Sequence, residues 1–176
     1  MFIKIDDLKV YYEVEGQGHP ILLLHGWGQS VAAFQPVFDY LKQNFRVYSL
    51  DFPGFGQSEE PQTVWSVYDY ADMVEKFVKQ LDIKNPTIFG HSFGGRVGII
   101  YAGRQNDLNK LVLIDSAGIK PKRGFGRHGL QHKAEADILF LCKTQRIHRP
   151  SSFITSITGT GTFSCIFSSN ARPSMG

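Results

Sequence analysis

Five residues near the middle of the chain have the types and spacing of a serine nucleophile site: Gly90-His91-Ser92-Phe93-Gly94. They follow the apolar run 86–89 and precede a helical pattern, so Ser92 is predicted to lie on a sharp strand-to-helix turn. Glycines two positions before and after the serine would let such a turn close without a side-chain collision. The first turn of the helix would place its positive end beside the serine hydroxyl. The alternative is a glycine-rich turn with an ordinary capping serine.

A second candidate loop, His25-Gly26-Trp27-Gly28, follows another apolar run at 20–24. Acyl transfer to a serine needs two hydrogen-bond donors directed at the oxyanion that develops on the substrate carbonyl. The backbone N–H groups of Phe93 and Trp27 are the two candidates for these donors. Taken alone, the 25–28 segment is also compatible with a plain strand-to-helix turn.

The elements that must hold these two loops alternate between strands and helices. Residues 1–16 alternate apolar and polar positions like a hairpin. Further strands are predicted at 20–24, 45–50, 86–89 and 111–114, and helices after Ser30 to Gln43, from Ser66 and from Gly94 to Arg104. Ser66 and Asp69 have the spacing of a capping box, and Pro36 marks a first helical turn or a kink. From residue 20 onward the order is βαβαβαβ, which predicts an α/β fold with a mostly parallel sheet and right-handed crossovers.

Four segments in this order and spacing resemble the α/β-hydrolase superfamily: HGWG at 25–28, DFPGFGQS at 51–58, GHSFGG at 90–95 and LVLIDSAG at 111–118. The resemblance covers about residues 8–120. It implies an eight-stranded sheet and hydrolysis through an acyl-enzyme, with Ser92 as the nucleophile and the Trp27 and Phe93 N–H groups as the oxyanion hole. It also implies that segment 51–58 is a structural turn, that His25 orders the oxyanion loop, and that His91 packs rather than catalyses.

After about residue 124 the family pattern is no longer recognisable. The helical lid, the strand that bears the usual acid and the last strand with its catalytic histidine are not visible, so we expect a truncated fold with the lid and last strands missing. Asp115, which follows strand 111–114, is a reserve candidate for the acid, although a polar strand end is its more usual interpretation. His128, His132 and His148 follow Ser92 in chain order, but none follows a recognisable strand.

Charge also divides the chain. Residues 1–118 contain 10 Lys and Arg against 14 Asp and Glu, whereas residues 119–176 contain 9 against 2. We therefore expect a partial hydrolase domain at 1–120 and a basic, Ser/Thr-rich, poorly ordered tail at 121–176, as a frameshifted or truncated product would have. No secondary structure is predicted for 151–170, and strand 111–114 is expected to form an exposed apolar edge.

Composition excludes several other classes of protein. The N-terminus has no secretory signal pattern, and no apolar run approaches the roughly 18 residues of a membrane span. Cys142 and Cys165 lack metal-ligand spacing, and the two isolated thiols fit a cytoplasmic protein. No cofactor or metal is expected, no G-x-G-x-x-G opens a helix after the first crossover strand, and the basic tail lacks the aromatic interleaving of a nucleic-acid module.

Two functions follow from these observations. The first is hydrolysis of a small, largely apolar carboxylester or a related C–C bond through Ser92, with the catalytic base missing from the recognisable part of the chain. The second is a non-catalytic remnant of the family that binds a small ligand or another protein. Enzymatic competence depends on whether any histidine reaches the Ser92 hydroxyl.

Overall fold

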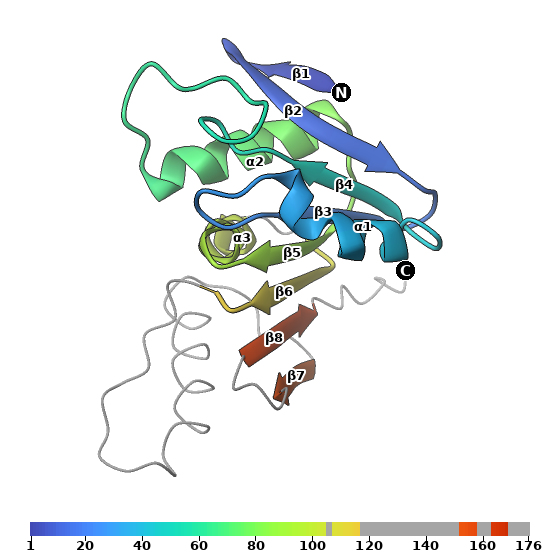
Figure 1. The fold of residues 1–176 in the computed structure, drawn as a ribbon. Helices are drawn as coiled ribbons and strands as arrows, with labels where there is room; N and C mark the ends of the chain where they lie inside the picture. The colour runs from blue at the N-terminus through green and yellow to red at the C-terminus, as the bar shows by residue number, and fades with distance from the viewer. Residues whose placement is uncertain (105–106, 117–151, 158–162, 169–176) are drawn as a thin grey trace, which may run out of the picture.

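The computed structural model describes residues 1–104, 107–116, 152–157 and 163–168. The described strands form one eight-stranded sheet in the order β1-β2-β4-β3-β5-β6-β8-β7 (Figure 1). Strands β4, β3, β5 and β6 are parallel, and antiparallel strands extend the sheet on both sides. The mixed α/β fold expected from the sequence is thereby confirmed.

The element bounds follow the sequence pattern closely. The strands are β1 Phe2–Ile5, β2 Leu8–Glu15, β3 Pro20–Leu24, β4 Arg46–Leu50, β5 Thr87–His91, β6 Lys110–Ile114, β7 Ser152–Ile157 and β8 Phe163–Ser168. The helices are the 3-10 turn η1 Val31–Phe34, α1 Gln35–Leu41, α2 Val67–Gln80 and α3 Phe93–Arg104. Pro36 lies in the first turn of α1, as expected, because its missing N–H is not needed there.

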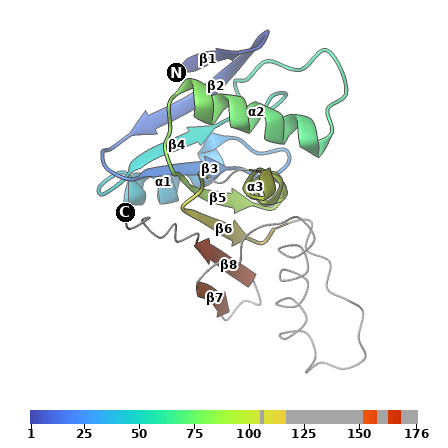
Figure 2. The same ribbon diagram turned by 180° about the vertical axis from the view of Figure 1, so that it is seen from behind.

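Helices cover both faces of the sheet, with α1 and α2 on opposite sides (Figures 1 and 2). On one face, buried residues of α2 and α3 such as Phe77 and Val97 join Leu22, Leu24 and Ile88 of the central strands in the larger core cluster. On the other face η1 and α1 pack on the alternate residues of the same strands; this smaller cluster comprises Ile21, Leu23, Phe34, Phe38 and Val47. Burial on both faces explains why β3 is an uninterrupted apolar run.

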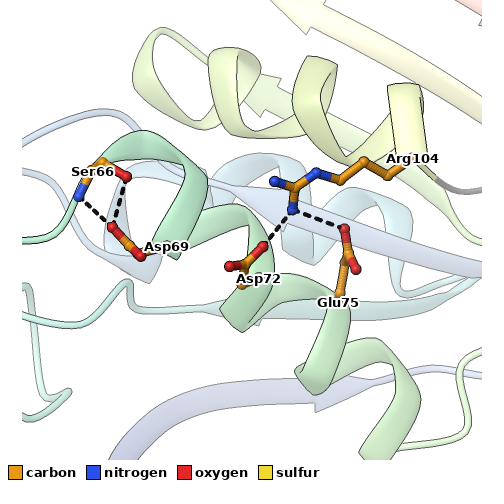
Figure 3. Close-up of polar contacts among 5 residues, drawn as sticks. All are labelled: Ser66, Asp69, Asp72, Glu75 and Arg104. Atoms are coloured by element: carbon orange, nitrogen blue, oxygen red, sulfur yellow. Dashed lines mark hydrogen bonds and ion pairs between the residues drawn. The ribbon is translucent and has the colours of Figure 1, made fainter. Parts of the chain in front are cut away.

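Polar contacts fix α2 at its start and against α3 (Figure 3). At the start of α2, the Asp69 carboxylate accepts hydrogen bonds from the Ser66 backbone N–H at 2.6 Å and from the Ser66 hydroxyl at 2.7 Å. The Ser66 side chain in turn accepts from the Asp69 backbone N–H, so the predicted capping box is present. Arg104, in the last turn of α3, donates to the carboxylates of Asp72 and Glu75 on α2. These ion pairs join the two helices that cover the same face of the sheet.

Two features of the C-terminal part of the sheet differ from the sequence-based expectation. Residues 151–170, for which no element was expected, contain β7 and β8. Strand β8 pairs antiparallel with β6, from Lys110 opposite Ser168 to Ile114 opposite Ser164, so β6 is not the edge of the sheet. The Phe and Ile residues among the Ser and Thr of these segments favour strands, but pairing with β6 is a tertiary effect that no local pattern reveals. The division at about residue 120 stays a prediction.

Candidate active site

Ser92 is the single residue between β5 and α3, and its backbone is in the left-handed region with φ 49°. Its N–H donates to the Ile114 carbonyl at 3.0 Å, and its own carbonyl accepts the Arg96 N–H at 3.3 Å. Non-glycine residues in this conformation cost roughly 1–3 kcal/mol and are concentrated at functional sites. The half-buried Ser92 side chain makes no hydrogen bond with the described residues. The geometry is that of a serine held at the carboxyl end of a central strand.

The glycines around Ser92 are required by close backbone approaches. A Cβ atom on Gly90 would lie 2.5 Å from Gly95 Cα and 2.7 Å from the Gly94 carbonyl oxygen. A Cβ on Gly94 would lie 2.1 Å from the Leu24 carbonyl oxygen, on the neighbouring strand β3. The collision expected from the sequence is thus present for Gly90, whereas Gly94 is a glycine because α3 begins directly against the end of β3.

The loop after β3 forms a β-turn across residues 26–29. The Gln29 N–H donates to the Gly26 carbonyl at 3.2 Å, and Gly28, at the third position, has φ +73°. A positive φ at this position is the requirement of a type II turn and favours glycine. Trp27 occupies the second position, and its side chain is 63% exposed.

Two backbone donors lie at this end of the sheet without an acceptor. Neither the Trp27 N–H nor the Phe93 N–H donates to any residue that the structure describes. The Phe93 N–H belongs to the first turn of α3, where helix donors have no intrahelical partner. The rings of Trp27 and Phe93 meet edge to face with centroids 5.1 Å apart, so the two loops adjoin. The structure therefore brings together the two residues that were expected to form the oxyanion hole.

Asp115 directly follows β6 and is exposed. His91 of β5 is paired with Ile114 of β6 in parallel register. Ser92 and Asp115 follow these two residues, so they are adjacent in register at the carboxyl ends of the two strands. Asp115 also has a left-handed backbone, with φ 44°. Within the described ranges it forms no hydrogen bond or ion pair, so the structure places the reserve acid beside the serine loop without a partner.

His25 is 1% exposed, and both of its ring nitrogens have partners. The Phe52 N–H donates to Nε2 at 3.0 Å, so this nitrogen is the unprotonated one. Nδ1 therefore carries the hydrogen and donates it to the Gly26 carbonyl at 2.8 Å. Burial lowers the pKa of His25, which keeps the ring neutral. Its contacts order the loop that contains Trp27 and leave no nitrogen for proton transfer.

The remaining histidines lie elsewhere. His19 precedes β3 at the amino ends of the central strands, whereas Ser92 lies at their carboxyl ends. There the His19 Nε2 contacts the Thr87 hydroxyl at 2.9 Å. His91 is the last residue of β5, and its Nδ1 lies 3.1 Å from Gln29 Oε1. His128, His132 and His148 fall outside the described residues. Among the described histidines, none is hydrogen-bonded to Ser92.

The segment 51–58 joins the 25–28 loop to β2, because the Phe52 N–H donates to His25 and the Tyr11 N–H donates to the Ser58 hydroxyl. The buried Asp51 carboxylate accepts the Val31 N–H at 2.7 Å with one oxygen and the Gln57 N–H at 2.8 Å with the other. A Cβ on Gly56 would lie 2.0 Å from Asp51 Oδ2, so that position must be glycine. Asp51 is thus a positioning carboxylate, with one backbone donor on each oxygen.

Aromatic rings surround the two candidate donors. Trp27 meets Phe55 at a centroid distance of 4.9 Å and Tyr70 at 6.4 Å, while Tyr70 meets Phe93 at 5.2 Å, all edge to face. The sequence indicated Tyr70 only as a member of the α2 core, and it did not indicate Gln29 at all. The contacts that give these residues their place at the site come from other elements, so no local signal could have revealed them.

No cluster of three or more His, Cys, Asp or Glu side chains in the described part of the chain could hold a metal ion. Across the same residues, no helix is both long and apolar enough to cross a lipid bilayer.

Comparison with known proteins agrees with this geometry. A model of the alpha/beta hydrolase fold family matches residues 19–138. The chain is 33% identical over 153 residues to the AB hydrolase superfamily protein YisY of Bacillus subtilis, covering 82% of this chain and 56% of that protein. It is 32% identical over 133 residues to a pimeloyl-[acyl-carrier protein] methyl ester esterase of Vibrio cholerae, covering 75% of this chain and 48% of the esterase.

Solved structures show the same likeness. The epoxide hydrolase CorEH without ligand matches with a TM-score of 0.65 and 31% identity, covering 72% of this chain and 46% of that one. The chain spans about half the length of the curated relatives it matches. Since the family model covers most of the chain and its motifs lie where the fold requires them, the chain belongs to the alpha/beta hydrolase fold family.

Proposed function

We propose that Ser92 is the nucleophilic residue of a serine hydrolase site that takes a small carboxylester or a related C–C bond substrate. The observation that carries the proposal is the position of Ser92, in a left-handed backbone conformation between β5 and α3, next to two backbone donors without acceptors. A turn of this shape exposes the hydroxyl above the strand ends, as nucleophilic attack requires.

In the proposed reaction the Ser92 oxygen attacks the substrate carbonyl carbon and its proton passes to a base. The Trp27 and Phe93 N–H groups stabilise the oxyanion that forms on the carbonyl oxygen. Collapse of this intermediate expels the alcohol, or the carbon leaving group, with a proton, and leaves an acyl-enzyme that water hydrolyses. Asp115 is the described carboxylate nearest in register to Ser92, which supports it as the group that would orient the base.

The surroundings favour an apolar substrate. The rings of Trp27, Phe55, Tyr70 and Phe93 form a connected aromatic surface beside the candidate oxyanion donors. Such rings contribute to the free energy of binding mainly by burying apolar groups of a ligand and by edge contacts with other π systems. The Vibrio cholerae relative is a methyl ester esterase, which supports a carboxylester as the substrate.

A second candidate is a non-catalytic member of the family that binds a small ligand or a protein. It is favoured by the contacts of two histidines, which keep them from acting as the base. His25 uses both ring nitrogens in hydrogen bonds, and His19 lies at the amino ends of the strands, away from Ser92. Without a histidine base, a serine hydrolase loses on the order of 10⁶ in kcat. The oxyanion hole and binding alone leave roughly 10³–10⁴ over the uncatalysed rate.

Labelling of the full chain with a fluorophosphonate, read by mass spectrometry, tests the nucleophile directly. We expect slow labelling confined to Ser92 and absent from the Ser92→Ala variant. Equal labelling of wild type and Ser92→Ala at another residue would contradict the assignment.

Turnover of an activated aryl ester separates the two candidates. We expect rates near background that change little in Ser92→Ala, His128→Ala, His132→Ala or His148→Ala, because no described histidine is hydrogen-bonded to Ser92; this result would favour the non-catalytic candidate. A large activity that one of the histidine changes abolishes would instead identify a working base and rule out the non-catalytic candidate.

A further inference from the structure

We infer that Gln29 and His91 form a clamp that positions the oxyanion turn against the serine loop, which makes both of them positioning residues for the site. The inference rests on the proposed function, because it assigns a role to the geometry around the Trp27 and Phe93 donors. The clamp joins residues 62 positions apart in the sequence: Gln29 closes the turn after β3, and His91 is the last residue of β5.

The donor and acceptor chemistry of the groups fixes the direction of the two hydrogen bonds that Gln29 forms with Gly26 and His91. The Gly26 N–H can only donate, and it lies 3.0 Å from Gln29 Oε1, so the atom facing it is the amide oxygen. The same oxygen lies 3.1 Å from His91 Nδ1, which must therefore carry a hydrogen and donate. Gln29 Oε1 thus accepts one bond from each loop. An oxygen with two lone pairs is fully used in this arrangement.

The space around Gly26 gives an independent reason for the clamp. Gly26 does not have a positive φ, so its backbone conformation does not demand glycine. A Cβ atom there would, however, lie 2.8 Å from Gln29 Oε1 and 3.0 Å from His91 Nδ1. A side chain at position 26 would therefore have to displace the ends of both clamp side chains.

The clamp acts on the spacing between the two candidate oxyanion donors. Trp27 lies within the turn whose ends are joined by the Gly26 and Gln29 bonds. Phe93 follows His91 by two residues and has a fixed backbone, because the Ser92 N–H is bonded to the Ile114 carbonyl. If His91 releases Gln29, the turn keeps its own backbone bond but loses its attachment to β5. The Trp27 N–H can then move relative to the Phe93 N–H.

The test compares His91→Ala, which removes the donor, with His91→Asn, which keeps one. The Asn Nδ2 is the same number of bonds from the Cα as the His Nδ1, so it can donate to Gln29 Oε1. Gln29→Ala and the double variant with His91→Ala complete a cycle. Thermal unfolding of each variant establishes that it folds, and hydrogen exchange of the Gly26 amide, followed by NMR, reports the clamp.

We expect Gly26 exchange to accelerate about three- to tenfold in His91→Ala and Gln29→Ala, as the loss of one hydrogen bond predicts. The double variant should be no faster than the Gln29→Ala single variant, because the residues act as a unit. His91→Asn should return exchange to within about twofold of wild type. The Gly54 amide, bonded to the Glu59 carbonyl, is the internal reference and should not change. Unchanged Gly26 exchange in a folded His91→Ala variant would overturn the clamp.

Binding of phenylboronic acid measures the consequence for the oxyanion site, since a serine boronate places an oxygen at that position. We expect the Kd to rise about tenfold in His91→Ala and to recover in His91→Asn, with no binding to Ser92→Ala. Equal Kd values for wild type and His91→Ala would overturn the positioning role. If wild type itself fails to bind, the proposed function is contradicted, while Gly26 exchange still decides whether the clamp exists.

Discussion

Replacing Gly94 by alanine adds one methyl group where α3 passes the end of β3. The new Cβ would lie 2.1 Å from the Leu24 carbonyl oxygen and 2.6 Å from that of His25. Both are backbone atoms, one in the last residue of β3 and one in the residue after it, and the shorter distance is more than about 1 Å inside van der Waals contact. Either α3 must shift away from the sheet or β3 must deform. Overpacking in a core costs typically 1–3 kcal/mol and more where backbone has to move.

The sign of the effect distinguishes this mechanism from helix propensity. Alanine is favoured over glycine in a helix by about 1 kcal/mol, so without the close approach Gly94→Ala would stabilise the protein. We expect instead a loss of at least about 2 kcal/mol in the free energy of unfolding. Gly98→Ala, in the same helix, is the matched control: its Cβ meets the flexible end of the Leu111 side chain at 2.9 Å. Its effect should stay within about 1 kcal/mol of zero, because the overlap and the propensity gain offset each other.

Urea unfolding monitored by far-UV circular dichroism measures both variants against wild type. Fluorophosphonate labelling of Ser92, run in parallel, reports whether the serine turn has moved. Equal free energies of unfolding for Gly94→Ala and Gly98→Ala, or a stabilised Gly94→Ala protein with unchanged labelling, would refute the close approach of α3 to β3.

Four further predictions concern the helices that support the site. Ser66→Ala should lower the free energy of unfolding by about 1 kcal/mol in urea titrations, because the Ser66 side chain accepts the Asp69 backbone N–H in the capping box of α2. Hydrogen bonds from Ser66 lower the pKa of Asp69. The stability that the ionised Asp69 carboxylate contributes is therefore present at neutral pH and is lost as the pH falls through the lowered pKa. Asp69→Asn should weaken this loss of stability in acid, measured by urea unfolding at a series of pH values. Burial raises the pKa of Tyr101 to about 12, so stability should fall as the pH rises from 10 through 12, and Tyr101→Phe should flatten this loss in thermal unfolding. Arg104→Gln should lower the free energy of unfolding by less than about 1 kcal/mol, because its ion pairs with α2 are partly exposed. The difference from wild type should disappear in high salt, which screens these pairs.

Much of the site could be predicted because its parts are local. The serine turn needs glycines at fixed offsets, and the buried strands are apolar runs that end in polar loops, so residue types alone placed Ser92 and the 25–28 loop at strand ends. Parallel strands bring their carboxyl ends to one edge of a sheet, and this general rule joins the two loops. The capping box of α2 could be predicted for the same reason, because Ser66 and Asp69 are three residues apart.

The parts that could not be predicted depend on pairs of residues far apart in the chain. Gly26 is consistent with any flexible turn until His91 is found against it. Gly94 was explained by crowding within its own turn, whereas its neighbour is Leu24 of another strand. The pairing of β8 with β6 likewise joins segments whose local patterns give no sign of each other.

The hydrogen bonds of His25 exclude this residue as the origin of a pH dependence of hydrolysis. Protonating His25 would place a hydrogen on Nε2 directly against the Phe52 N–H, and burial already lowers the pKa of this ring. His25 therefore stays neutral and keeps its loop in one arrangement across neutral pH. His25 should therefore not impose a rise in ester hydrolysis near pH 6–7. Such a rise, if measured, must come from a base supplied by another group, and its disappearance in one histidine variant would identify that group.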